Sequence, residues 1–264
     1  MILSLHPLKA SRQLRWDLIV YKALSSLHSE TSRSRLGFAW WILDPVLYMC
    51  VFYVVFGLIF ERGGPDFVVK LLIALVVWRW FDNSVKACAS SLVTGVGLMR
   101  QVYVSKFLFP LAAIIAQSLK FLAVLSILLA FLVIYGIELS ASWLGLIPIL
   151  LTELLFIGGL GILLAAIIPF FPDLKILIDY GIQLGFFLSG IFYDISQIPD
   201  SVAVYFHLNP MAMFIDQSRQ VLLLQQGPDW AVLGWIAIAS LAMIALGSYL
   251  LGRYDRDYPT LLLT

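Results

Sequence analysis

The chain has 264 residues, of which 61% are hydrophobic and 12% charged, and its mean hydropathy is +0.96. Soluble domains are nearer half apolar, so this composition excludes an ordinary water-soluble fold and indicates an integral membrane protein. The net charge of +1 points to no class of partner, and nothing suggests nucleic acid. The two cysteines, Cys50 and Cys88, lie in apolar surroundings and predict neither a disulfide nor a metal site.

The first 37 residues form a basic, amphipathic leader. Trp16, Ile19, Val20 and Ala23 recur at three- and four-residue spacing, so they share one face of a helix that is expected to lie in the membrane interface. Two roles stay open for this helix: a passive anchor on anionic headgroups, or a working part of the protein. Gly37 follows it and places a flexible point at the membrane surface.

Long apolar runs predict six membrane-spanning helices, because each crossing of a ~30 Å hydrocarbon core takes ~20 residues. Helices are expected because open strands leave backbone groups without partners in lipid. The expected spans are 38–60, 67–92, 108–135, 143–169, 174–195 and 230–252. The predicted fold is therefore an all-α membrane protein with one domain, 1–264. It divides into a leader (1–37), a membrane region (38–252) and a tail (253–264).

Lysine and arginine predict the orientation. Most of these residues outside the spans fall on the N-terminal side of the membrane, whereas the opposite loops clearly hold only Arg62 and Arg219. Because basic residues accumulate in cytoplasmic segments, both termini are expected in the cytoplasm.

Aromatic residues follow one face of the first span. Trp41, Tyr48, Phe52 and Phe56 lie at offsets of seven, eleven and fifteen residues. Such a stripe is either ordinary helix packing or the lining of a path for sugars, whose apolar C–H faces pack on aromatic rings. Asp44-Pro45 in the same segment resembles a helix N-cap with a first-turn proline, so the span is alternatively expected to begin at Pro45.

Charged residues inside the predicted spans are few. Arg79, Asp82 and Lys86 stand at spacings of three and four, so they can neutralise one another on one helix face. Lys120 and Glu153 lie near the middles of the third and fourth spans. They are interpreted as a structural pair or as polar groups turned toward a cavity, in preference to a proton relay, which needs a chain of carboxylates.

Two connecting segments carry further expectations. The cytoplasmic stretch 98–110 exposes Leu98, Met99, Val102 and Tyr103, which would be costly in water unless a partner covered them, so a docking site for a cytosolic protein is predicted. The outer segment 191–230 alternates apolar runs with helix breakers. Short re-entrant or surface helices are expected there.

Together these features resemble the permease subunits of type-2 ABC exporters that move bacterial surface polysaccharides, as in O-antigen, capsule and teichoic acid export. The resemblance covers essentially the whole chain. It rests on Arg35-Leu36-Gly37 through Asp44-Pro45, Val102-Tyr103 to Phe109-Pro110, Phe171-Pro172-Asp173, and Asn209-Pro210-Met211 with Arg219.

The resemblance implies a role for each of these segments. Residues 12–28, including Trp16, Ile19, Val20 and Ala23, would form a gate helix, and short gate helices at the periplasmic mouth would lie within 196–226. The segment containing Leu98, Met99, Arg100, Val102 and Tyr103 would couple to the ATPase. The candidate substrate contacts are Leu36, Gly37, Trp41, Tyr48, Phe52 and Tyr193.

The resemblance also implies the partners and the location. Two copies would pair with two cytosolic ABC ATPase subunits in the bacterial inner membrane, among membrane lipids, and pass a lipid-linked polysaccharide. The chain has no Gly-x-x-x-x-Gly-Lys-Ser/Thr phosphate loop, so ATP and magnesium are expected on the partner and no cofactor on this chain. O-antigen is the preferred cargo. Pro172, where many O-antigen permeases have arginine, keeps capsule export open.

Two other classes of function stay open. A type-2 exporter of drugs or lipids would share the fold and the coupling segment. A membrane-embedded enzyme that transfers glycans would need paired carboxylates or a histidine near one face, whereas His6, His28 and His207 are scattered. No catalytic residue and no metal site are therefore predicted.

Overall fold

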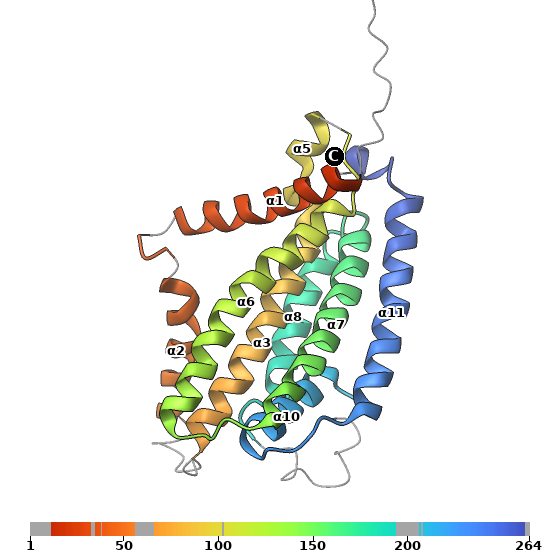
Figure 1. Cartoon of the computed structure of the whole chain (residues 1–264). Coiled ribbons are helices and arrows are strands. Elements are labelled where there is room, and N and C mark those ends of the chain that lie inside the picture. The colour runs from red at the N-terminus through yellow and green to blue at the C-terminus, as the bar shows by residue number, and fades with distance from the viewer. Residues whose placement is uncertain are drawn as a thin grey trace, which may run out of the picture.

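The computed structural model describes residues 12–32, 35–37, 39–55, 66–101, 103–193, 206 and 208–261. None of these residues lies in a strand, and the long helices form one bundle (Figure 1), so the predicted all-α class is confirmed for this part of the chain. The helices are α1 (Arg12–Ser32), α2 (Ala39–Phe52), α3 (Phe67–Ala89), α4 (Ser91–Thr94), α5 (Val96–Gln101), α6 (Leu108–Tyr135), η2 (Ala141–Gly145), α7 (Leu146–Ile167), α8 (Leu174–Leu188), α10 (Pro210–Leu223), α11 (Trp230–Arg253) and α12 (Tyr258–Leu261).

Three helices are long and apolar enough to cross a bilayer: α6, η2 continued by α7, and α11. The bounds of α6 and α11 agree with the predicted spans 108–135 and 230–252 to within one residue, because uninterrupted apolar runs define both ends. α3 is equally long but carries four charged residues, and α2 and α8 are shorter. The count of six spans stays a prediction.

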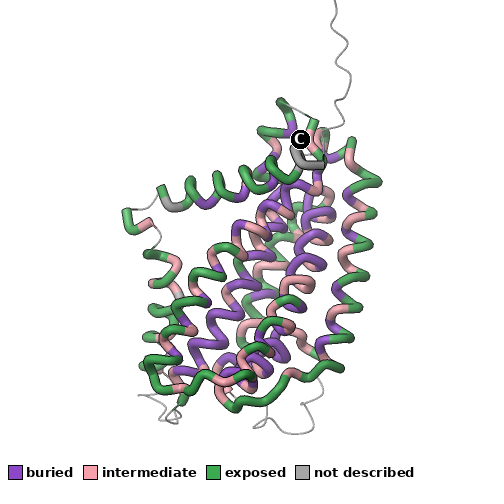
Figure 2. The backbone as a smooth tube through the Cα atoms, in the orientation of Figure 1, coloured by how far each residue is buried: buried purple, intermediate pink, exposed green. Residues whose placement is uncertain are grey.

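α3 is the central helix of the bundle, and most of its residues are buried (Figure 2). Two successive aromatic residues fix it between its neighbours. Trp80 stacks on Phe121 of α6 with ring centroids 4.1 Å apart, and Phe81 stacks on Phe156 of α7 at 5.7 Å. Each stacked pair adds about 0.5–1.5 kcal/mol beyond the area it buries. α3 therefore separates the facing sides of α6 and α7.

Small residues bring α7 close to α3 and α11. A face of small residues includes Gly161, where a Cβ would lie 2.8 Å from the Cβ of Cys88 in α3. Gly159 and Gly247 extend it: their Cβ atoms would lie 2.7 Å from the Ser240 carbonyl oxygen and 2.8 Å from the Leu163 nitrogen. Because backbones approach this closely only at small residues, α7 and α11 form the tightest helix pair of the bundle.

The two ends of the bundle differ (Figure 1). α1 lies across one end, where α5 and α12 also lie, and α10 lies at the opposite end. We refer to these as the α5 end and the α10 end. Ile19, Ala23 and Leu27 of α1 are buried at intervals of four residues, and α1 packs on α6.

The bundle covers only part of the predicted leader face. Ile19 and Ala23 are buried, whereas Trp16 and Val20 are 51% and 44% exposed. The gate role of this helix stays a prediction.

At the α10 end, Asn209 and Arg219 clamp α10 to its neighbours. The Asn209 side chain caps α10 by accepting from Met211 N at 3.0 Å, and it donates to the Leu188 carbonyl at 3.1 Å. Arg219 is 6% exposed and donates to four backbone carbonyls, at distances of 2.8–3.3 Å, on Lys70, Gly190, Ile191 and Tyr193. A helix before the last span is therefore confirmed, whereas membrane re-entry stays a prediction and residues 194–205 lie outside the described part.

Candidate functional site

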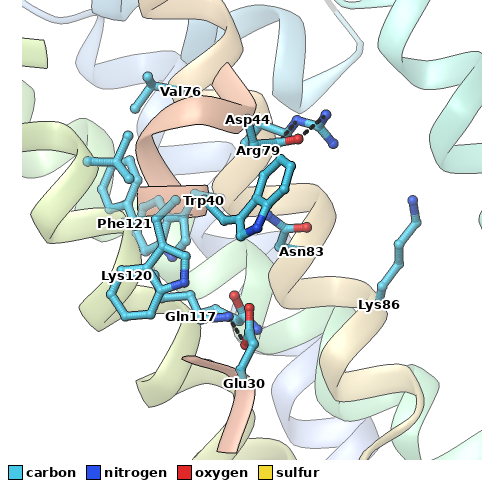
Figure 3. A pocket seen from close by; sticks show the side chains of 13 residues that line it. Glu30, Trp40, Asp44, Val76, Arg79, Asn83, Lys86, Gln117, Lys120 and Phe121 are labelled. Atoms are coloured by element: carbon cyan, nitrogen blue, oxygen red, sulfur yellow. Dashed lines mark hydrogen bonds and ion pairs between the residues drawn. The ribbon is translucent and has the colours of Figure 1, made fainter. Parts of the chain in front are cut away.

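A cavity of about 430 Å³ opens between α1, α2, α3 and α6 (Figure 3). In this view the Asp44–Arg79 pair lies at one end of it and Glu30 at the other. Its wall combines charged side chains with the aromatic rings of Trp40, Trp41 and Trp80. We call it the α1–α3 cavity.

An alternating row of charges runs from Asp44 of α2 along α3, and Asp44, Arg79 and Lys86 of this row line the α1–α3 cavity. Asp44 Oδ2 lies 3.2 Å from Arg79 Nε, Arg79 Nη1 lies 3.5 Å from Asp82 Oδ2, and Asp82 Oδ1 lies 2.5 Å from Lys86 Nζ. The predicted mutual neutralisation of Arg79, Asp82 and Lys86 is confirmed, and Asp44 adds a fourth member. Asp44 was interpreted as an N-cap. That interpretation is wrong, because α2 already begins at Ala39 and the Asp44 carboxylate turns to α3.

Lys120 forms an ion pair with Glu30 of α1. The alternative that Lys120 turns toward a cavity is confirmed, and its pairing with Glu153 is wrong. The physical reason is the position of α3. Phe121, next to Lys120, stacks on Trp80 of α3, and Phe156, near Glu153, stacks on Phe81 of α3. α3 therefore lies between the two charges. Glu153 is fully buried, and neither of its carboxylate oxygens has a hydrogen-bond partner among the described residues.

Aromatic rings bracket the cations. The Arg79 guanidinium carbon lies 4.0 Å from the centroid of the Tyr48 ring, and Lys120 Nζ lies 5.6 Å from that of Trp41. The indole nitrogen of Trp80 is buried and has no hydrogen-bond partner in the described part of the chain. The cavity therefore offers ring faces and charged side chains, a combination suited to a polar ligand with apolar faces.

A second cavity of about 560 Å³ lies between α2, α3 and α8, and we call it the α3–α8 cavity. Tyr48, Arg79 and Lys86 line it, and Arg79 and Lys86 also line the α1–α3 cavity. From α8 it receives polar and aromatic side chains such as Gln183 and Tyr180. The charged face of α3 thus serves both cavities.

The remaining substrate-contact candidates are dispersed. Leu36 is 51% exposed in the turn between α1 and α2, where Gly37 has a φ of +50° that favours glycine. The side chain of Phe52 and residue Phe56 lie outside the described part. Tyr193 lines neither cavity: its hydroxyl donates to the Phe187 carbonyl at 3.1 Å. Among the candidates whose side chains the structure describes, Trp41 lines the α1–α3 cavity and Tyr48 lines the α3–α8 cavity.

The coupling candidates lie at the α5 end. Tyr103 is 80% exposed, and Leu98 and Arg100 are also exposed. The expectation that Met99 is exposed is wrong, because its side chain is buried in the core. Val102 lies outside the described residues. The exposed side chains fit the predicted docking segment, whose role stays a prediction. An unexpected partner is Asp255, whose carboxylate accepts a 2.7 Å hydrogen bond from the Tyr103 hydroxyl.

Several cavity residues were missed by the sequence reasoning. Glu30 and Asp44 are acids at the edge of apolar segments, a signal that could have suggested pairing with Lys120 and Arg79. No sequence signal distinguished Trp40 and Trp80 from other apolar residues, because their role depends on the packing of α2 and α6 against α3.

Comparison with known proteins adds independent evidence. The O-antigen export system permease protein RfbA of Klebsiella pneumoniae is 28% identical over 209 residues, which cover 79% of this chain and 81% of that protein. The protein of the same name from Myxococcus xanthus is 27% identical over 87% of this chain and 88% of its own length. The polysialic acid transport protein KpsM of Escherichia coli is 22% identical over 85% and 88%.

The family model described as ABC-2 type transporter matches residues 25–223, which include both cavities' helices α2, α3, α6 and α8. The match covers well over half of the chain, and the chain therefore belongs to the ABC-2 type transporter family.

Proposed function

We propose that this protein is the membrane subunit of an exporter that moves a lipid-linked polysaccharide, with O-antigen as the cargo, across the bacterial inner membrane. The observation that carries the proposal is the similarity to three O-antigen permeases over 79–87% of the chain. The two cavities support the proposal independently.

The two cavities match the chemistry of a glycan. Pyranose rings present apolar C–H faces to aromatic rings, and their hydroxyls need hydrogen-bonding partners. Trp41 and Tyr48 provide the faces, and Arg79 and Gln183 provide polar partners. Membrane lipid alone would not require this polar set.

A second copy of the chain would cover the α3–α8 cavity. Arg79, Lys86 and Asp179 line this cavity, and their charges would be costly against hydrocarbon. Around it, α8 exposes an apolar face, and its single buried residue is Ile182. A charged strip inside an apolar face fits a water-filled path between two subunits.

Both termini would be cytoplasmic, with six spans. Basic residues concentrate at the α5 end, where Arg100, Arg253 and Arg256 are exposed, whereas Arg219 at the α10 end is buried and bonded to backbone. This distribution follows the positive-inside rule. The α5 end would then face the cytosol and a pair of ABC ATPase subunits.

ATP and magnesium would bind to the partner subunits, because this chain lacks the phosphate loop and is proposed to bind no cofactor. ATP-driven closure of the ATPase pair would push on Leu98 to Tyr103 and shift α1. That shift would break the Glu30–Lys120 pair across the α1–α3 cavity. The side chain of Glu30 is 54% exposed and that of Lys120 is 13% exposed, so water can reach one partner of the pair.

The test is glycan export by the permease and its ATPase in membrane vesicles. Trp41→Ala and Tyr48→Ala should each lower the export rate about tenfold while leaving ATP hydrolysis intact. Trp235→Ala is the matched control, since Trp235 is exposed on α11 and lines neither cavity. Equal export by all three variants would refute the cavity as a glycan path.

Capsule export is the second candidate, because the polysialic acid transport proteins of Escherichia coli are also similar over most of the chain. Pro172 in the exposed turn before α8 is the sequence feature that favours it. Supplying either glycan to the same vesicles distinguishes the two cargoes.

A further inference from the structure

The C-terminal tail meets the coupling segment at the α5 end. The Tyr103 hydroxyl donates to Asp255 Oδ2 at 2.7 Å, and Lys106 Nζ lies 3.9 Å from Asp255 Oδ1. The Asp255 carboxylate therefore contacts two residues of the linker between α5 and α6. About 150 positions separate Asp255 from this linker in the sequence.

The two linker residues differ in burial. Lys106 is 3% exposed and also donates to the Val104 carbonyl at 3.1 Å, so its position is fixed from several sides. Tyr103 is 80% exposed, and its ring lies 5.1 Å from Lys106 Nζ. The hydrogen bond to Asp255 raises the pKa of Tyr103, so its hydroxyl keeps the donated proton at neutral pH. Asp255 thus holds an exposed aromatic ring in one orientation.

The tail is in turn fixed to the end of α7. Tyr258 is fully buried, and its hydroxyl donates to the Ala166 carbonyl at 3.1 Å. Phe170, just beyond α7, packs edge-on against Tyr254 at 5.2 Å and Tyr258 at 5.5 Å. The tail therefore bridges the coupling segment and α7.

We propose that the tail, residues 253–261, is part of the surface that receives the ABC ATPase, and that Asp255 is a positioning residue that presents Tyr103 to it. The inference rests on the proposed function, which places a separate ATPase at the α5 end. It adds the tail to a docking surface that the sequence had limited to Leu98–Tyr103.

The chemistry of this surface specifies its partner. Leu98, Tyr103 and Phe171 expose apolar area at the α5 end, where the basic side chains of Arg100 and Arg256 are also exposed. Exposed apolar groups at an aqueous end need cover. The partner surface should therefore pair an apolar socket with acidic residues, and ATPase subunits are the partner that the family membership implies.

The tail also provides a second path by which a movement of the coupling segment would be transmitted to the helices. Movement of Tyr103 would reach α6 along the backbone, and it would reach α7 through Asp255 and Tyr258. Because α7 packs tightly on α11 through Gly159 and Gly247, both helices would move with the tail.

The experiment uses the complex of permease and ABC ATPase in vesicles, with glycan exported per ATP hydrolysed as the readout. Asp255→Ala and Tyr103→Phe should each lower this ratio about three- to tenfold, as expected for loss of a charge-assisted hydrogen bond. The double variant should be no worse than Asp255→Ala alone, because that change already removes the Tyr103–Asp255 contact. Asp255→Glu should restore much of the ratio.

The matched control is Glu138→Gln, an exposed acid in the loop after α6 and outside the proposed docking surface, which should leave the ratio unchanged. The melting temperature of each permease variant separates positioning from folding, and it should not fall for Tyr103→Phe.

If the Asp255→Ala permease retained the ATPase and exported as much glycan per ATP hydrolysed as the wild type, the inference would be overturned. The proposed function would still stand. Failure of the wild-type permease to bind any ABC ATPase would overturn the proposed function, and the inference with it.

Discussion

Arg219 and Arg79 both lie within the helical bundle, yet they are held in opposite ways. Arg219 is almost completely buried, and it donates hydrogen bonds to backbone carbonyls of α3 and of the turn after α8. Arg79 is partly exposed, pairs with the carboxylates of Asp44 and Asp82, and lies over the ring of Tyr48.

The difference separates a structural arginine from an exchangeable one. Backbone carbonyls cannot turn away without breaking the fold, so Arg219 fixes α10 permanently. Carboxylate side chains can rotate away, and a partly hydrated ion pair contributes little stability. A ligand could therefore replace the partners of Arg79 but not those of Arg219. Substitutions at Arg219 and Asp44 test this contrast, and substitutions at Gly247 and Glu153 compare other buried contacts of the bundle.

Arg219→Met should destabilise the protein by about 3–5 kcal/mol, because four backbone carbonyls lose their donors at once. Unfolding of the purified permease in detergent measures the change. Arg79→Met is the matched control and should cost about 1 kcal/mol or less. Equal losses for the two arginines would contradict the contrast.

Gly247→Ala should destabilise the α7–α11 pair by about 1–3 kcal/mol, since the new Cβ would lie 2.8 Å from the backbone nitrogen of Leu163. Gly234→Ala, in the same helix, meets open space and should be neutral or stabilising. Thermal unfolding compares the two. If both variants melted at one temperature, the tight approach of α7 and α11 would be wrong.

Asp44→Asn should lower glycan export about tenfold and change stability by less than ~1 kcal/mol, because it alters an exchangeable pair that is 46% exposed on the Asp44 side. Asp66→Asn, at an exposed position before α3, is the control. A large stability loss with normal export would assign Asp44 a structural role instead.

Glu153→Met should stabilise the protein by about 1 kcal/mol, since a buried carboxylate without a hydrogen-bond partner in the described residues is replaced by an apolar side chain of similar size. Glu138→Gln, exposed in the loop after α6, should change stability by less than ~0.5 kcal/mol. A lower melting temperature for Glu153→Met would mean that the carboxylate has a favourable partner.

The helices were predictable from the sequence wherever composition alone defines them. α6 begins and ends at the predicted residues because an apolar run, opened near Pro110 and closed by Gly136, is a local property. The charges of α3 were recognised for the same reason, because Arg79, Asp82 and Lys86 lie within two turns of one helix.

Long-range contacts of the site could not be predicted in this way. Asp44 and Arg79 are 35 positions apart and Lys120 and Glu30 are 90 apart, so their pairing depends on how α1 and α2 pack on α3 and α6. The predicted pairing of Lys120 with Glu153 was wrong because α3 lies between the two side chains. The contacts that make the cavity are the ones that only tertiary packing decides.

The central claim is that the aromatic and charged faces around Arg79 form the glycan path, and site-specific photo-crosslinking tests it most directly. A photo-reactive amino acid replaces Tyr48 or Trp41 in one set of permeases and Trp235 in the control, and nascent glycan is captured during ATP-driven export. The account predicts glycan adducts at positions 41 and 48 that require ATP, with none at 235. Absence of adducts at both cavity positions during active export would contradict it.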